Sequence, residues 1–98
     1  MISELLRTAA VVCREVAIDH APILYAVRSQ PVEPADSGWQ FLCGAREEDP
    51  GEAQVWAVHE VLEYDRSIEP LIEKPPGTVL WRDSASDRWQ VGYDEARG

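Results

Sequence analysis

The chain has 98 residues, of which 45% are hydrophobic, and its 18 acidic and nine basic side chains give a formal net charge of −9. We expect this length to form one domain spanning residues 1–98. The apolar content and the four tryptophans exclude a disordered chain. The acidic balance argues against nucleic acid or an anionic membrane as a partner, because both are negatively charged.

The first thirty residues predict two strands. Residues 9–13 form a short, continuous apolar run, which is typical of a buried strand. Residues 19–22 predict a turn, and residues 23–28 alternate between two sets of side chains as a second strand does. Residues 2–8 are consistent either with a helical turn or with a frayed start.

A proline-containing loop leads into the third predicted strand. Residues 30–38 contain two prolines, which resist both helix and central strand. Residues 39–44 then alternate at period two, with Trp39 and Phe41 on the same face. We therefore expect these two aromatic side chains to pack into the core.

The second half of the chain predicts an acidic loop, helical segments and a hairpin. Residues 45–52 form the acidic loop, after which apolar residues recur at helical spacing over residues 58–64 and again over residues 68–72. Residues 78–82 and 88–93 predict the two strands of a hairpin, because apolar and polar side chains alternate along both. These elements predict an α+β fold: a small single domain with a mainly antiparallel sheet of about five strands and one or two short helices packed on one face.

The helix that contains His59, Glu60 and Glu63 resembles an incomplete zinc-protease motif. That motif needs two histidines four residues apart, but Glu63 stands at the second position and His20 is the only other histidine. A solvated helix face is therefore the expected reading, and we predict no metal site and no cofactor. An unrecognised enzyme that uses His59 and Glu60 stays open as the less favoured alternative.

The two cysteines, Cys13 and Cys43, lie in apolar segments. The N-terminal residues lack the basic and long apolar regions of a signal peptide, and no apolar run is long enough for a membrane span. We therefore expect a cytoplasmic protein whose cysteines stay reduced and behave as small hydrophobic side chains.

Most of the negative charge lies in the middle of the chain. Residues 31–75 contain eleven acidic and three basic residues, a net charge of −8. Four of these acids, Glu47, Glu48, Asp49 and Glu52, fall in one predicted loop, and their spacing does not match a calcium-binding EF-hand. This loop is the candidate contact for a basic protein partner, although an acidic surface that only aids solubility would look the same. Trp56 is the tryptophan that we most readily place at a surface beside it.

Three segments of the chain resemble the immunity protein 33 family, which is also classed as a domain of unknown function. They are Asp36-Ser37-Gly38-Trp39-x-Phe41-x-x-Gly44, then Tyr64-Asp65-x-Ser67-Ile68-x-Pro70-Leu71, and then Pro76-Gly77 leading into residues 79–82. The resemblance covers about residues 10–89. Members of this family are small bacterial proteins, some of them encoded beside polymorphic toxins. The resemblance brings no catalytic residues with it.

The resemblance implies a non-enzymatic, cytoplasmic binding domain that neutralises a cognate toxin by direct protein–protein contact through an acidic surface. The partner-binding residues under this hypothesis are Glu47, Glu48, Asp49, Glu52 and Trp56. The alternative is a stand-alone regulatory or ligand-binding domain. The sequence leaves the oligomeric state open.

Overall fold

Six strands form one sheet in the part of the chain that this computed structural model describes, residues 2–44 and 53–96. The strands are β1 (Ala9–Val12), β2 (Tyr25–Arg28), β3 (Asp36–Leu42), β4 (Gln54–Ala57), β5 (Thr78–Trp81) and β6 (Gln90–Tyr93). Their order in the sheet is β4-β1-β3-β2-β5-β6. The strands β1 and β3 run parallel, whereas the other neighbouring pairs described are antiparallel.

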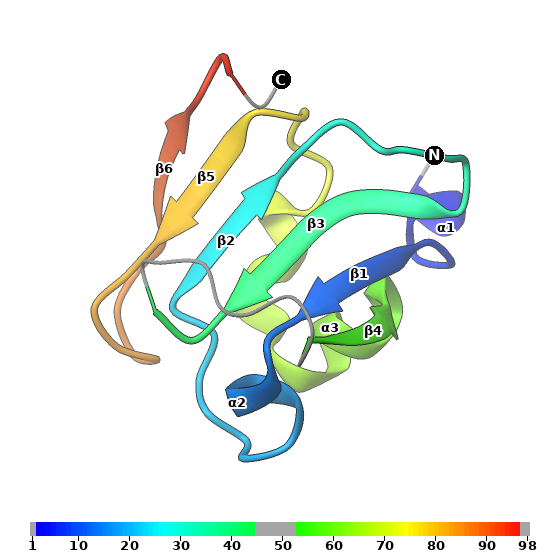
Figure 1. Ribbon diagram of the computed structural model, residues 1–98. Coiled ribbons are helices and arrows are strands. Elements are labelled where there is room, and N and C mark those ends of the chain that lie inside the picture. The colour runs from blue at the N-terminus through cyan, green and yellow to red at the C-terminus, as the bar shows by residue number, and fades with distance from the viewer. Residues whose placement is uncertain (1, 45–52, 97–98) are drawn as a thin grey trace.

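The helices of the described residues are short. They are α1 (Ile2–Leu5), α2 (Arg14–Ala17), α3 (Val58–Tyr64) and the 3₁₀ helix η2 (Arg66–Leu71). Figure 1 shows α3 and η2 behind the sheet, across β1, β3 and β2, with α2 at the end of β1. The predicted α+β class and mainly antiparallel sheet are confirmed. None of the described helices is long and apolar enough to cross a membrane.

The expected number of strands was one too low, because β4 was not predicted. This strand has four residues, and Val55 within it is 72% exposed, so its composition carries no clear alternation. It pairs with β1 at the edge of the sheet, and the chain continues directly into α3. The four-residue helix α2 was not predicted either, because one helical turn is too short to show a period.

The aromatic side chains of β3 form the centre of the core, as the alternation predicted. Trp39 is 1% exposed and Phe41 is fully buried, and their rings stack with centroids 5.5 Å apart. The indole N–H of Trp39 donates to the backbone carbonyl of Ile72 at 3.0 Å. This bond satisfies the one polar atom of a buried indole and fixes the segment after η2 to the sheet.

The two predicted helical segments and the predicted hairpin are also confirmed in kind. The helix α3 buries Val58, Val61 and Leu62 on one face, as the apolar spacing predicted. The strands β5 and β6 pair antiparallel as a hairpin, with Leu80 opposite Val91. The second helical segment is a 3₁₀ helix, and it contains Pro70.

Candidate functional site

The segment that begins with Asp36 builds a bulge in β3. Ala9 pairs with Asp36 and Val11 with Gln40, so β3 has two more residues than β1 over the same stretch. Gly38 adopts a φ of 83°, and a Cβ at this position would lie 2.0 Å from the carbonyl oxygen of Ser29. Only glycine fits this conformation and this close approach. The bulge in β3 therefore explains why the motif has glycine at position 38.

Polar side chains brace the same bulge from both sides. The Asp36 carboxylate accepts backbone N–H bonds from Gly38 at 2.9 Å and Val32 at 3.0 Å. The Arg28 guanidinium donates to the carbonyls of Ser37 at 2.9 Å and Lys74 at 2.8 Å. Burial lowers the pKa of Arg28, and the Asp36 carboxylate partly opposes that shift. These side chains hold backbone groups, so this motif positions the strands of the sheet.

The second motif is organised by a buried arginine. Arg82, which directly follows β5, has a side chain that is 2% exposed, and its Nη2 lies 2.5 Å from the Asp65 carboxylate. It also donates from Nε and Nη2 to the carbonyl of Ile23 at 3.1 and 2.9 Å. A further donation from Nη1 reaches Ser67 Oγ at 3.2 Å. One guanidinium thus joins three segments that are distant in the sequence.

Ser67 and Trp89 complete the network around this arginine. The Ser67 hydroxyl donates to Asp65 Oδ1 at 2.6 Å and accepts from the indole N–H of Trp89 at 2.9 Å. The Arg82 guanidinium lies 4.1 Å from the centre of the Trp89 ring, a distance at which a cation is attracted to the face of an aromatic ring. Trp89 is therefore held from its edge and from its face.

Next to Trp89 the surface has an open groove of about 440 Å³. Its lining includes Pro70 and Leu71 from η2, Trp89 itself, and Arg88. An aromatic side chain with an arginine beside it is a combination that is enriched at binding hot spots. This groove is thus one candidate contact surface of the described chain.

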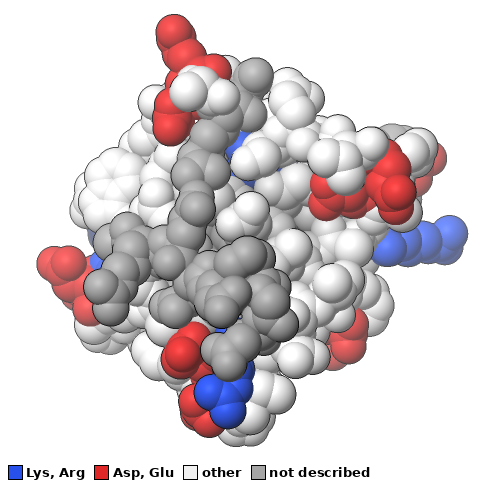
Figure 2. Space-filling model, in the orientation of Figure 1, with Lys and Arg blue, Asp and Glu red and all other residues white. Residues whose placement is uncertain are grey.

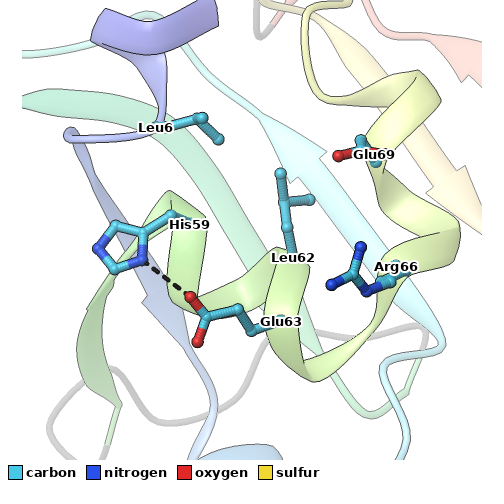
Figure 3. A pocket seen from close by; sticks show the side chains of 6 residues that line it. All are labelled: Leu6, His59, Leu62, Glu63, Arg66 and Glu69. Carbon is cyan, nitrogen blue, oxygen red and sulfur yellow. Dashed lines mark hydrogen bonds and ion pairs between the residues drawn. The ribbon is translucent and has the colours of Figure 1, made fainter.

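A second, smaller pocket lies on the other side of η2. It has a volume of about 190 Å³ and is lined by Leu6, His59, Leu62, Glu63, Arg66 and Glu69. Figure 3 shows Leu6 and Leu62 on the apolar part of the pocket, with Arg66 and Glu69 projecting toward it from η2. Small-molecule sites are usually larger, about 300–1,000 Å³, so the pocket suits one side chain of a partner better than a cofactor.

The structure gives His59 and Glu60 separate roles. Glu60 Oε1 accepts the backbone N–H of Ala57 at 2.9 Å, which caps the start of α3. His59 Nδ1 lies 3.4 Å from Glu63 Oε2, and both side chains are more than half exposed, at 52% and 72%. The pair that the enzyme alternative needs, His59 with Glu60, is therefore not brought together as a hydrogen-bonded pair in the described residues.

Trp56 is half-buried at the edge strand β4. Its ring packs edge-on against Tyr64, with centroids 5.6 Å apart and an interplanar angle of 70°. The Tyr64 hydroxyl donates to the carbonyl of Ala21 at 2.6 Å. Burial raises the pKa of Tyr64, with smaller contributions from Asp65 and Cys13. Trp56 thus contributes to packing around α3 while part of its surface stays accessible.

The acidic loop of the sequence analysis lies outside the described residues. This applies to Glu47, Glu48, Asp49 and Glu52, whose role stays a prediction. Figure 2 shows the other acidic side chains of the visible face as separate groups around its rim. On the segment from α3 to η2, Glu60, Glu63 and Glu69 are all exposed.

The organising roles of Arg28 and Arg82 were not predicted from the sequence. A signal was present in both cases, because each arginine stands at the end of a predicted apolar strand, where a charge needs a partner. The partners could not be identified, since Arg82 reaches Asp65 and Ile23 only through the tertiary fold.

A comparison with known protein families finds a match that contains both of the motifs described above. The family model of the Immunity protein Imm33 domain matches residues 10–92. Neither a search of curated proteins nor a search of solved structures finds a match. The matched residues include all of β1 except Ala9, all of β2 to β5 and all of β6 except Tyr93, so the match covers nearly the whole sheet. The chain therefore belongs to the family of the Immunity protein Imm33 domain.

Proposed function

We propose that the protein neutralises a cognate bacterial toxin in the cytoplasm by direct contact through an acidic surface, without catalysis. Membership of an immunity protein family supports the toxin as partner. The observation that carries the acidic contact is the face formed by α3 and η2. There the exposed carboxylates of Glu63 and Glu69, together with the cation Arg66, border a pocket whose apolar lining comes from Leu6 and Leu62.

This arrangement has the composition expected of a binding surface. An apolar depression can take an anchoring side chain, while charged groups at its rim set the association rate and the choice of partner. A toxin that acts on nucleic acid must present a basic substrate-binding face, because it has to neutralise phosphates. An acidic surface that occupies this face would block the substrate. The predicted loop with Glu47, Glu48, Asp49 and Glu52 would extend the same charge complementarity, with Trp56 as a further anchor.

The non-enzymatic reading has its own support in the described residues. The Glu60 carboxylate is engaged in capping α3, and the side chains of His59 and Glu63, which line the smaller pocket, are 52% and 72% exposed. A general base works best where its surroundings hold it in position beside a bound substrate. Immunity protein families are also generally families of binding proteins rather than enzymes.

The test is protection of cells that express the toxin domain encoded beside the gene, together with association kinetics at several salt concentrations. Changing Glu47, Glu48, Asp49 and Glu52 to Gln or Asn is expected to slow association and weaken protection. A second variant, Glu63→Gln with Glu69→Gln, tests the described face in the same way. Glu63 and Glu69 are exposed, and exposed charges add little stability, so the second variant should fold. Circular dichroism checks the folding of both variants.

A matched control variant and the salt dependence of association distinguish long-range electrostatic attraction to the partner from other effects of the substitutions. Glu33→Gln with Glu95→Gln removes two exposed charges that line neither the groove nor the smaller pocket, and this variant should protect as well as the unaltered chain. Association should slow as salt rises, because the Debye length is about 8 Å at physiological ionic strength. Full protection by both acidic-surface variants would refute the proposed contact. The interface would then be sought around Trp56 and Trp89.

A further inference from the structure

Two cysteines and a glutamate come together where β1 and β3 end. Cys13 follows β1 and precedes the first residue of α2, Glu15 lies in the first turn of α2, and Cys43 follows β3. Because β1 and β3 run parallel, their carboxyl ends lie at the same edge of the sheet. The backbone N–H of Cys13 donates to the carbonyl of Phe41 at 3.0 Å, which fixes the two segments beside each other.

The potential ligand atoms of these side chains are close to one another. The sulfurs of Cys13 and Cys43 and a carboxylate oxygen of Glu15 all lie within 4.8 Å of each other. No disulfide joins the two cysteines. In a tetrahedral zinc site the ligand atoms are roughly 3.4–3.8 Å apart, since Zn–S is about 2.3 Å and Zn–O about 2.0–2.2 Å. Small side-chain adjustments would therefore bring all three atoms onto one ion.

Glu15 provides an independent reason to place a cation here. Its Oε1 is buried and accepts no hydrogen bond, and it is the one side-chain atom of the described residues in this condition. A buried carboxylate oxygen without a donor or a cation is costly, so such atoms are rare in folded proteins. Cys13 beside it is fully buried. A positive ion between the oxygen and the sulfurs would remove this cost.

We propose that Cys13, Glu15 and Cys43 bind one soft divalent cation, with Zn²⁺ as the expected ion and water at a fourth position. Thiolates favour zinc over the hard cations Mg²⁺ and Ca²⁺, which prefer oxygen ligands. Each thiol releases its proton as it binds the ion. The ion would join the ends of β1 and β3 to the start of α2. This role is structural and does not depend on the proposed toxin contact. The proposed site departs from the prediction of no metal site, which rested on the spacing of the histidines and of the loop acids.

The test is a titration of the reduced, chelator-treated full chain with Co²⁺, whose thiolate complexes are coloured, followed by displacement with Zn²⁺. We expect one ion per chain, a thiolate-to-cobalt absorption band and a higher Tm in the presence of Zn²⁺. Glu15→Gln and Cys43→Ser should each weaken Co²⁺ binding by about 100-fold or more, because even outer partners of a metal ligand contribute roughly 10–100-fold. Glu33→Gln, which changes an exposed carboxylate, is the matched control and should bind as the unaltered chain does.

Three results would overturn the proposal. The first is a reduced chain that shows no thiolate band at stoichiometric Co²⁺, a result that needs no variant. The second is equal binding by the Glu15→Gln and Glu33→Gln variants, with folding checked by circular dichroism. The third is a Cys13–Cys43 disulfide that forms in air while the reduced chain takes up no Zn²⁺, which would assign the pair a redox role instead.

Discussion

Replacing Asp65 with alanine removes the counter-ion of a guanidinium that has almost no access to water. The Arg82 side chain is 2% exposed, and Asp65 supplies the carboxylate that faces it. Removing one partner of a buried ion pair typically costs about 3–5 kcal/mol, because the other charge stays buried without compensation. The same carboxylate accepts the backbone N–H of Ser67 at 3.0 Å, so the start of η2 also loses its cap. We expect Asp65→Ala to lower the free energy of unfolding by about 3–5 kcal/mol, a large part of the roughly 5–15 kcal/mol of a small domain.

Urea denaturation followed by tryptophan fluorescence measures this loss. With a urea m-value of about 1–3 kcal/mol/M, the midpoint should fall by at least about 1 M. Asp83→Ala is the matched control, since Asp83 is an exposed acid beside the same arginine, and its effect should stay within about 0.5 kcal/mol.

A double-mutant cycle tests the reasoning further. Arg82→Met combined with Asp65→Ala leaves no buried charge, so the double variant should be more stable than the sum of the single effects by about 1–3 kcal/mol. A cost below about 1 kcal/mol for Asp65→Ala, or simple additivity in the cycle, would refute the role assigned to this ion pair.

Three further substitutions probe the core and the motifs. Trp39→Ala should lower the free energy of unfolding, measured by heat or urea, by about 3–5 kcal/mol, because it empties a buried site and leaves the Ile72 carbonyl without its donor. A stability like that of the unaltered chain would contradict the core position of Trp39. Gly38→Ala should lower the free energy of unfolding by more than the roughly 1–3 kcal/mol of a strained backbone conformation, since the φ of Gly38 is 83° and a Cβ there would meet a backbone oxygen. An unchanged stability would argue against the bulge. Tyr64→Phe should cost about 1 kcal/mol at neutral pH through its lost hydrogen bond to Ala21. Because the pKa of Tyr64 is raised in the folded chain, the unfolded state ionises first, and the unaltered chain loses stability above a pH of about 10. The difference in free energy of unfolding between the unaltered chain and Tyr64→Phe should therefore shrink there, and a constant difference would contradict this.

The alternation and the apolar spacing of the sequence predicted most of the regular elements. Trp39 and Phe41 share a face because successive side chains of a strand point to opposite sides, a property that local geometry fixes. The helix over residues 58–64 followed from apolar residues on one face, which only burial can satisfy. Such periodic signals need no knowledge of neighbouring segments.

The tertiary structure decided which segments meet, and with them the elements and sites that the sequence left hidden. The strand β4 is recognisable only through its pairing with β1, because four residues with an exposed Val55 carry no pattern of their own. Arg82 acquires its partners from loops and helices far along the chain, and Cys43 meets Cys13 only because β1 and β3 run parallel. Local sequence encodes periodicity and turn chemistry, whereas the charge, donors and potential metal ligands that come together at a point in space depend on the order of strands in the sheet.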